Sequence, residues 1–400
     1  MIWPVISLAS ALDSSPIFVD GDWVESKDQD PEGDVRLIQL ADVGDGYYVN
    51  KSSRFLTSES AQRLNCTFLE PGDVLVARMP DPLGRACIFP GDTKRTVTVV
   101  DVCIIRPDTE KVHAPWLMHC INSPQSRNQI SGYITGTTRA RISRGNLAKV
   151  GVRLPPLEEQ RHIAAILDQA ETLRTQRRAA LALLDSLTQS LFLDMFGDPS
   201  AEDSKWSQTQ LDVVAELVTG YPFRSEEYVG PDEGIKLCRG ANVLPGRLDW
   251  RDMVCWPHEK VKEAEAFHLR AGDIVMAMDR PWISEGFKLT KVDASDCPML
   301  LVQRVARIRP KSEVTNEYLL AVLSHGAFTR HCKPTETTIP HISPKDIRSF
   351  SFPLPPLPLQ QTFATRIASI EALKATHRRA LAALDALFAS LQQRAFAGAL

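Results

Sequence analysis

The sequence has almost no excess charge of either sign. Its 46 lysine and arginine residues face 49 aspartate and glutamate residues, so the formal net charge at pH 7 is -3. A protein that binds DNA without regard to sequence depends on many phosphate contacts and therefore on a strongly basic surface. The balanced charge disfavours that class of DNA binder, although it leaves room for local basic patches.

Paired cysteines and long apolar runs are also missing. The eight cysteines are scattered, with no two within three residues of each other, so neither a C-x-x-C motif nor the spacing of zinc ligands occurs. We expect reduced thiols, no metal site and a cytoplasmic protein. Asp101, Asp185 and Asp194 interrupt the most apolar stretches before these reach the length of about 18 residues that a membrane helix needs. We therefore expect a soluble chain that has no membrane partner.

The sequence contains none of the common catalytic signatures. There is no phosphate-binding G-x-x-x-x-G-K-[ST] loop, and Gly44-Asp45-Gly46 lacks the third glycine of a dinucleotide-binding turn. Neither H-E-x-x-H nor G-x-S-x-G occurs. The only Pro-Pro pairs are followed by leucine, which excludes the Pro-Pro-Tyr box of amino-methyltransferases, and the acidic stretch 107–111 is too short to supply a nuclease site from two strands. We predict a non-catalytic chain that binds no cofactor of its own.

What the chain does contain is an internal duplication. A length of 400 residues suggests two or three domains at roughly 150 residues per domain. Residues 154–197 align without a gap on residues 354–397, and both segments begin with Leu-Pro-Pro-Leu. The same offset of 200 relates Gly72-Asp73 to Gly272-Asp273. The duplication therefore covers the whole chain.

Each copy reads as a variable domain followed by a proline-rich elbow and a long helix. We predict an α+β fold with β-rich mixed domains at residues 1–153 and 200–353, and elbow-and-helix segments at 154–199 and 354–400. The expected strands are 74–77, 97–102, 274–278 and 300–308, and the expected short helices are 59–64, 116–121 and 317–323.

The two helices should pair with each other. About 39 residues at about 1.5 Å each give a helix close to 58 Å long, which exceeds what one small domain can cover. Apolar residues recur in a heptad pattern in both copies, which predicts an antiparallel coiled coil with a pseudo-two-fold axis; burial of each helix against its own domain is the alternative. The residues predicted to pair the helices are Ile163, Ile166, Leu173, Arg177, Leu184, Leu187, Leu191, Phe363, Ile370, Leu373, His377, Leu384, Leu387 and Leu391.

Two polar residues interrupt this pattern near the midpoints of the helices. Arg177 and His377 occupy the same position of the repeat, 200 residues apart. In an antiparallel pair the midpoints lie opposite each other, so we expect the two side chains to meet and to fix the register of the helices. The alternative is that both side chains extend into solvent.

Basic residues cluster in the predicted loops of both domains. Loops on a rigid scaffold commonly carry binding residues, and arginine suits the recognition of guanine and phosphate. For each residue alone a solvated charge is the alternative. The candidates for DNA binding are Arg78, Arg85, Arg139, Arg141, Arg144, Arg239, Arg280, Arg330, His331 and Lys333.

The segment from Leu154 through the Pro-Pro elbow, Glu158-Glu159-Gln160 and the helix to Gly197-Asp198-Pro199 resembles the central conserved region of the specificity subunit of type I restriction-modification enzymes. This resemblance implies two target-recognition domains, each reading one half of a bipartite double-stranded DNA target. It also implies that the helices seat two adenine-N6 methyltransferase subunits, and that motor-nuclease restriction subunits complete a phage-defence complex. S-adenosylmethionine, ATP and Mg then belong to those partners. In the second copy Pro358-Leu359 replaces the usual Glu-Glu, so the second elbow departs from the family pattern.

Two other functions remain open at this point. The chain can be a duplicated coiled-coil scaffold whose domains bind proteins rather than DNA. It can also be a methyltransferase or nuclease itself, which the missing catalytic motifs disfavour.

Overall fold

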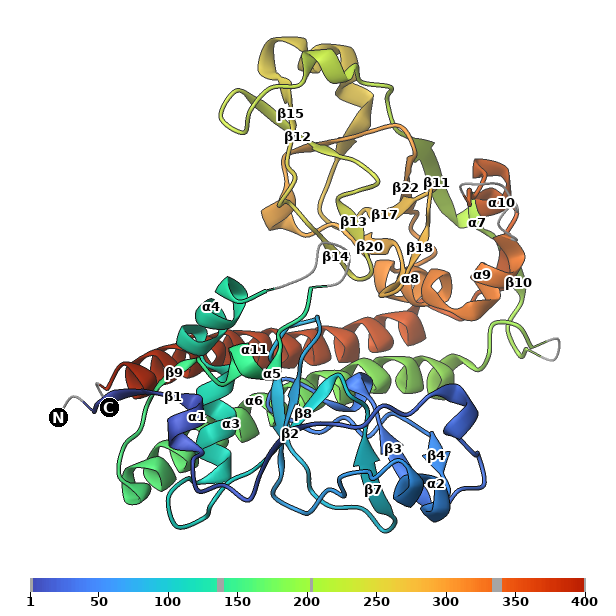
Figure 1. The fold of residues 1–400 in the computed structure, drawn as a ribbon. Helices are drawn as coiled ribbons and strands as arrows, with labels where there is room; N and C mark the ends of the chain where they lie inside the picture. Colours follow the sequence, from blue (N-terminus) through green and yellow to red (C-terminus); the bar gives the residue numbers. More distant parts are fainter. Residues whose placement is uncertain (1–2, 135–139, 202–203, 333–339, 399–400) are drawn as a thin grey trace. The chain divides into compact units, whose positions relative to one another are not determined.

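The computed structural model describes residues 3–134, 140–201, 204–332 and 340–398. The chain divides into two compact units (Figure 1), of which unit 1 contains Met1–Ala179 and Arg378–Leu400, and unit 2 contains Ala180–His377. Each unit thus combines one sheet-rich domain with half of helix α6 (Leu157–Phe196) and half of helix α11 (Leu357–Ala397). The predicted class, sheet-rich domains joined by long helices, is confirmed.

The main sheet of unit 1 is antiparallel and buried on both faces. Its four strands lie in the order β2-β8-β5-β6. Side chains alternate along β5, so that Val74 and Val76 join the core shared with the long helices, whereas Leu75 and Ala77 face a second core. This double burial explains why the strand is apolar at every position. The strands are β2 (Ile17–Asp20), β5 (Val74–Ala77), β6 (Ala86–Ile88) and β8 (Val102–Arg106).

A smaller sheet and a strand pair complete unit 1. The smaller sheet has the order β4-β3-β7, and its β3–β7 pair is parallel. The remaining strands are β1 (Val5–Ser7), β3 (Val35–Ile38), β4 (Phe55–Leu56), β7 (Arg95–Thr98) and β9 (Gly151–Arg153), with β1 paired to β9. The helices are α1 (Leu8–Ala11), α2 (Ser58–Arg63), α3 (Ala114–Asn122), α4 (Pro124–Gly132) and α5 (Arg144–Leu147).

Unit 2 repeats this plan, which agrees with the duplication. Its main sheet has the order β11-β22-β17-β20, its second sheet the order β15-β12-β21-β16, and β12 and β21 are parallel as β3 and β7 are. The strands of the two sheets are β11 (Ala215–Thr219), β12 (Gly234–Cys238), β15 (Cys255–Pro257), β16 (His268–Leu269), β17 (Ile274–Ala277), β20 (Leu289–Lys291), β21 (Met299–Leu301) and β22 (Val305–Pro310).

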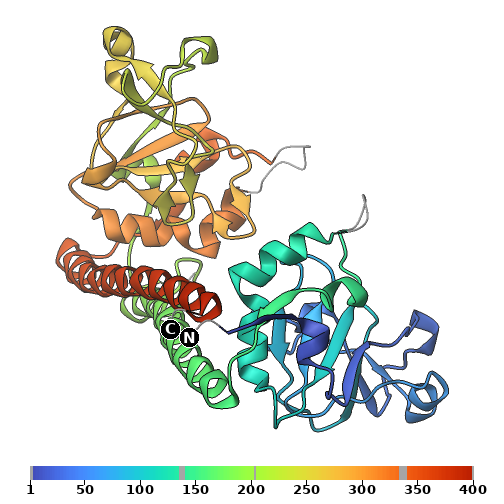
Figure 2. The ribbon, with the colours of Figure 1, turned by 60° about the vertical axis from the view of Figure 1, so that its left-hand side comes forward.

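Three strand pairs and several short helices lie outside these two sheets. The pairs are β10 (Gln208–Gln210) with β23 (Ser351–Pro353), β13 (Val243–Leu244) with β14 (Arg247–Leu248), and β18 (Trp282–Ile283) with β19 (Gly286–Phe287). The α-helices of this unit are α7 (Leu211–Val214), α8 (Asn316–Ser324), α9 (Gly326–Cys332) and α10 (Pro344–Arg348). Figure 2 shows the β-rich part of each unit from a second direction.

Most predicted short elements are confirmed, but two predicted strands are wrong. The helices at 59–64, 116–121 and 317–323 correspond to α2, α3 and α8. The run 97–102 is divided between β7 and β8 by a turn, and the run 300–308 is divided between β21 and β22 at Arg304, whose φ is +73°. A polar residue within an apolar run marked the turn in each case, as Asp101 and Arg304 show.

Within each unit the two long helices are antiparallel, and each also packs on the domain. In unit 1, Ile163 near the start of α6 shares a core with Phe396 near the end of α11 and with Trp116 of α3. In unit 2, Phe192 and Phe196 near the end of α6 contact Phe363 near the start of α11. From the sequence, pairing of the two helices and burial of each helix against its own domain were alternative arrangements. The structure shows both.

One of the two predicted heptad registers is correct. Ile163, Ala170, Phe363 and Ile370 are buried, and Leu184, Leu191, Leu384 and Leu391 are half-buried. The second register is wrong, because Leu173, Leu187, Leu373 and Leu387 are 40 to 53% exposed, and Ile166 is only half-buried. The inward positions lie one residue later, at Leu167, Arg174, Leu181 and Thr188 in α6 and at Ile367, Lys374, Leu381 and Phe388 in α11.

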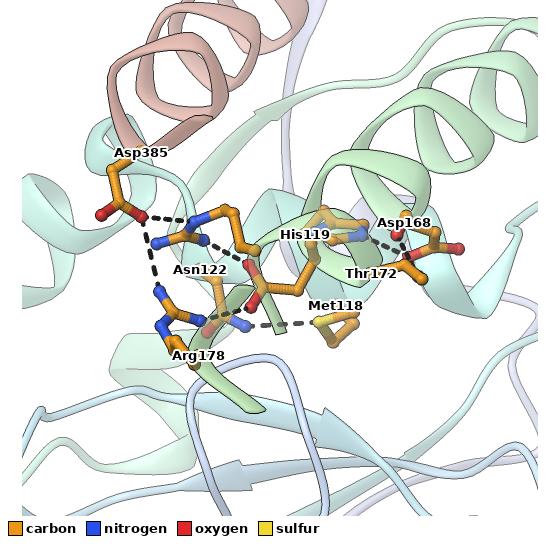
Figure 3. Close-up of polar contacts among 9 residues, drawn as sticks. Met118, His119, Asn122, Asp168, Thr172, Arg178 and Asp385 are labelled. Atoms are coloured by element: carbon orange, nitrogen blue, oxygen red, sulfur yellow. Dashed lines mark hydrogen bonds and ion pairs between the residues drawn. The ribbon is translucent and has the colours of Figure 1, made fainter. Parts of the chain in front are cut away.

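A cation therefore sits in the helix seam of each unit, at the same place in the repeat. In unit 1 Arg174 donates to Asp385 of the facing helix at 2.6 Å and to Glu171 of its own helix. In unit 2 Lys374 lies 2.8 Å from Asp185 and 2.8 Å from Glu371. Figure 3 shows Asp385 of unit 1, where the neighbouring Arg178 also reaches it at 3.4 Å.

Buried polar contacts also join the domain of unit 1 to α6. His119 of α3 is almost fully buried and its Nε2 lies 2.7 Å from Oδ1 of Asp168 on α6 (Figure 3). Arg177 and His377, which we expect to meet, lie on opposite sides of the division between the units. Their contact stays a prediction.

A buried glutamine joins each elbow to its domain by hydrogen bonds. Gln160 is 1% exposed, accepts a hydrogen bond from His113 N at 2.8 Å, and donates to the carbonyls of Lys111 and Pro155 at 2.9 Å. Gln360 makes the equivalent three contacts in unit 2, with Thr315, Glu313 and Pro355. The second elbow therefore keeps this anchor although Pro358-Leu359 replaces Glu-Glu.

We expect Gln160→Leu to lower the free energy of unfolding by about 2 to 3 kcal/mol, because it leaves buried backbone groups without partners. Urea unfolding followed by circular dichroism measures this loss. Gln169→Leu is the matched control, since Gln169 is exposed on the same helix, and it should change stability by less than about 0.5 kcal/mol. Equal effects of the two substitutions would contradict the role of Gln160.

Candidate nucleic-acid interface

Three chain segments meet at one end of the main sheet in each unit. In unit 1, Arg78 follows β5; its N–H donates to Asp101 O at 2.9 Å and its carbonyl accepts from Ile142 N at 3.1 Å. In unit 2 the same contacts join Met278 after β17 to Arg304 and Ile342, both at 2.9 Å. This end of the sheet gathers four of the basic loop residues that the sequence singles out, Arg78, Arg85, Arg141 and Arg280, and we call it the loop end.

Two of the predicted DNA-binding residues are buried at the loop end. Arg78 donates to the carbonyl oxygens of Ile142 and Val100 and forms an ion pair with Asp20. Arg85 donates to four carbonyl oxygens, those of Leu40, Val43, Met79 and Pro82, at 2.6 to 3.1 Å. Burial lowers the pKa of the Arg85 guanidinium. Both arginines hold loops in place by contacts within their own domain, and their contact with DNA stays a prediction.

The sequence could not separate these two roles. A loop position and a positive charge are visible in it, but the direction of the guanidinium group is not. A buried arginine that gives most of its donors to groups of its own domain has few left for a base or a phosphate.

The other candidates of unit 1 are more exposed. Arg141 is 38% exposed and lies 3.0 Å from Asp101, which places it at the loop end. Arg144 begins α5 and donates to the carbonyl of Phe18 at 2.8 Å. Arg139, and Lys333 of unit 2, lie outside the described residues.

In unit 2 the loop end carries an exposed group of cations. Arg280 is exposed and has a φ of +44°, and Arg304 is 57% exposed with a φ of +73°. Such backbone angles are uncommon for residues other than glycine, asparagine and aspartate. They occur where a loop is held in place by its surroundings. Asp279 contacts both Arg304 at 3.5 Å and Nδ1 of His341 at 2.5 Å.

Arg304 is a candidate that the sequence reasoning missed. Arg304 lies within the expected strand 300–308, so it was not among the cations that the sequence assigned to loops. Its polar neighbour Gln303 and the apolar residues on either side were the available signal for a turn.

Two cations near this end make structural contacts. Arg239 forms a 2.9 Å ion pair with Asp252. Lys288 is buried, its ammonium group donates to the carbonyl of Gly240, and burial together with the nearby charge of Arg280 lowers its pKa. Arg330 and His331 lie elsewhere, on α9, where Arg330 donates to Ser200 Oγ at 2.6 Å and His331 Nε2 lies 3.0 Å from Asp346 O.

The described residues offer no arrangement suited to a metal ion. Among them no group of three or more histidine, cysteine, aspartate or glutamate side chains lies close enough to bind one. All eight cysteines are unpaired, as expected for reduced thiols. Burial raises the pKa of Cys87, Cys120 and Cys238 to about 12, so these thiols stay protonated at neutral pH and are poor nucleophiles.

Helix α6 exposes much of its apolar surface. One 18-residue stretch of it reaches a mean hydropathy of 1.3, yet only 11% of that stretch is buried. Length and composition would allow α6 to cross a membrane, which the sequence reasoning did not anticipate. The ion pairs and core contacts that join it to α11 in each unit identify it instead as a pairing helix with one uncovered side.

The family described as type I restriction modification DNA specificity domain matches residues 20–183 and 257–385, which is more than half of the chain. The EcoAI type I restriction enzyme specificity subunit of Escherichia coli is 34% identical over 153 residues, which cover 38% of this chain and 26% of that protein. The MjaVIII specificity subunit of Methanocaldococcus jannaschii is 26% identical over 253 residues, 60% of this chain and 59% of that protein. The chain thus spans less than two thirds of either relative.

Two solved structures have a similar fold. One is a crystal structure of a type I restriction-modification system S subunit from M. genitalium, with a TM-score of 0.57 and 14% identity over 98% of this chain and 96% of that chain. The other comes from work on complex assembly and conformational transition of the type I R-M system, with a TM-score of 0.57 and 19% identity over 100% and 98% of the two chains. At these identities the likeness concerns the fold alone.

Proposed function

This chain belongs to the type I restriction-modification DNA specificity family, and on that premise we propose that each of its units reads one half of a bipartite double-stranded DNA target. The observation that carries the proposal is the repeated loop end. The same three segments meet there in both units, while the exposed side chains differ. Two equivalent scaffolds with different surface residues suit two different half-sites.

The chain acts in this proposal as the non-catalytic subunit of a cytoplasmic phage-defence complex. Two adenine-N6 methyltransferase subunits and motor-nuclease restriction subunits are its protein partners. S-adenosylmethionine, ATP and Mg bind to those subunits. The buried thiols, which stay protonated at neutral pH and are poor nucleophiles, support a non-catalytic role.

The exposed leucine stripe, which comprises Leu173, Leu187, Leu373 and Leu387, is the proposed docking surface for the methyltransferase subunits. Unit 1 contributes Leu173 and Leu387, and unit 2 contributes Leu187 and Leu373, which are the same positions of the repeat. Each unit therefore offers one equivalent apolar patch, and apolar patches on helices commonly bind partner proteins. Two equivalent patches predict two copies of the same partner.

We expect the double substitution Leu173→Asp and Leu387→Asp to remove one of the two methyltransferase copies, because it places two carboxylates in the patch of unit 1 only. Native mass spectrometry of the co-expressed complex measures the stoichiometry, which should fall from two copies to one. Val213→Asp is the control, since Val213 is 61% exposed on α7 outside the stripe. Retention of both copies by the double variant would exclude the stripe as the docking surface.

The proposed function is tested by sequencing genomic DNA for N6-methyladenine. Cells express the methyltransferase subunit with and without this chain. A split methylated motif that appears only with the chain supports the proposal and reveals both half-sites. Association of the two proteins without any new motif contradicts DNA reading by this chain, and the absence of both association and a new motif favours the scaffold.

A further inference from the structure

A tight hairpin occurs at the same place in both units. In unit 1, Val43 pairs with Tyr48 and Gly44 N donates to Tyr47 O at 3.0 Å. In unit 2, β13 and β14 form the same turn, with Val243 opposite Leu248 and Leu244 opposite Arg247. The glycines at positions 46 and 246 both have a positive φ, +88° and +70°, which a tight hairpin turn requires.

The two hairpins are attached to their domains by equivalent backbone contacts. Gly46 N donates to Ala86 O at 2.9 Å, and Gly246 N donates to Leu289 O at 3.0 Å. At the base of each turn, Val49 N donates to Asp42 O and Asp249 N donates to Asn242 O, both at 2.8 Å. These bonds fix the position of each turn against the edge strand of its main sheet.

Buried polar side chains reinforce each base. The carboxylate of Asp42 is fully buried and accepts hydrogen bonds from Gln39 N, Lys51 N and Ser52 N at 2.6 to 2.8 Å. Asn242, at the same position of unit 2, is 1% exposed; it accepts from Arg239 N at 3.1 Å and donates to Asp249 O at 2.9 Å.

A buried cation holds the chain just before each turn. Arg85 donates to Leu40 O at 2.8 Å in unit 1, and Lys288 donates to Gly240 O in unit 2. Leu40 and Gly240 are 200 residues apart, as the repeat requires. Arg85 and Lys288 thus donate to the equivalent carbonyl oxygen in the two units. Both hairpins are therefore held rigidly on their domains.

The tip residue is what differs between these matched hairpins. Tyr47 occupies the position in unit 1 and is 62% exposed, and Arg247 occupies it in unit 2 with 56% of its side chain exposed. The ring of Tyr47 lies over Gly44, where an added Cβ would be 2.9 Å from Cε2. Arg247 lies 3.2 Å from Glu285, an ion pair between two exposed groups that is weak in water and easily exchanged.

We propose, on the basis of the proposed function, that positions 47 and 247 are base-reading positions, and that Arg247 reads a guanine in the half-site of unit 2. A two-stranded ribbon fits the major groove, where arginine donates two hydrogen bonds to O6 and N7 of guanine. The tyrosine ring at position 47 offers an apolar surface suited to a thymine methyl group. A rigid support with an exchangeable tip lets two equivalent domains read different bases.

The test compares methylation motifs of the full complex that contains the chain or its variants, again by N6-methyladenine sequencing. Arg247→Ala should relax one G·C position in one half-site, with at least about a ten-fold loss of discrimination, and leave the other half-site unchanged. Arg247→Gln should shift the preference at that position from guanine towards adenine, which glutamine recognises. Tyr47→Ala should relax one position of the opposite half-site.

Arg251→Ala is the matched control, because Arg251 is an 86% exposed arginine near the same turn, and it should leave the motif unchanged. Thermal melting of each variant separates misfolding from altered reading. A split motif for the wild type that Arg247→Ala and Arg247→Gln leave unchanged would overturn this inference alone. A uniform loss of methylation at all sequences by folded variants would also overturn it, since that result indicates a phosphate contact. Absence of any split motif for the wild type would instead contradict the proposed function.

Discussion

Replacement of Lys374 by glutamate is expected to lower the free energy of unfolding by about 3 kcal/mol, because it puts a carboxylate at a buried position that a cation occupies beside two other carboxylates. Lys374 is only 4% exposed in the helix seam of unit 2. Its ammonium group lies 2.8 Å from both Asp185 and Glu371. Glutamate at this position would place a third carboxylate beside these two.

The pKa of Lys374 supports the same conclusion. Burial by itself lowers this pKa, but the hydrogen bonds with Asp185 and Glu371 outweigh burial, so the pKa lies above its ordinary value of 10.5. The folded state therefore binds the proton more tightly than the unfolded chain does. The stabilisation is complete below pH 10.5 and is lost as the pH rises through the folded value. Neutral pH is thus the right condition for the measurement.

The repeat itself supplies the control for this substitution. Unit 1 has Arg174 at the equivalent position, bonded to Asp385 and Glu171 in the same way. Lys374→Arg should therefore change stability by less than about 1 kcal/mol. Adding Asp185→Lys to Lys374→Glu should restore part of the loss, and a double-mutant cycle by urea unfolding isolates the pair. If glutamate and arginine at position 374 cost the same, the ion pair does not stabilise the seam.

The sequence predicted the large features of the fold because the duplication repeats them. The gapless alignment of residues 154–197 with 354–397 located both elbows and both long helices. In the structure these helices begin at Leu157 and Leu357. Gln160 and Gln360 were visible as an identity within that alignment. Their role was not, because two of the three backbone groups that each glutamine binds lie more than 40 residues earlier in the chain.

The pattern of apolar residues could not predict the second heptad register correctly, for a physical reason. Leu173 and Leu373 are more apolar than Arg174 and Lys374, so a pattern of apolar residues selects the leucines for the seam. The carboxylates of Asp385 and Asp185 on the facing helix make the cation positions favourable. That compensation depends on the pairing of the two helices, which the pattern of either helix alone does not contain.

The candidate site was predicted by region rather than by residue. Arg78, Arg85, Arg141 and Arg280 do gather at the loop ends, but the first two bind carbonyl oxygens of their own domain. Nothing in the sequence distinguishes the exposed hairpin-tip residues Tyr47 and Arg247, since a single tyrosine or arginine in a turn is common. They became comparable only when the matched contacts of Gly46 and Gly246 were known.

A four-residue insertion into both long helices is expected to lengthen the DNA spacer that the protein accepts by one or two base pairs. The division between the units crosses α6 between Ala179 and Ala180, and α11 between His377 and Arg378. Four residues there add about 6 Å to each helix, which is one or two base pairs at about 3.4 Å each. Both half-sites should stay the same because no loop changes, and methylation sequencing reports spacer and half-sites together.

The number of inserted residues decides whether the helices still pair. Four residues exceed one turn of 3.6 residues by about 40°, so the seam beyond the insertion is displaced only slightly. One residue rotates the seam by about 100° and adds only about 1.5 Å, which turns Arg174 or Lys374 away from its partner carboxylate. The one-residue variant should therefore lose stability without gaining spacer length. A folded four-residue variant with an unchanged spacer would show that the helices do not set the distance between the half-sites.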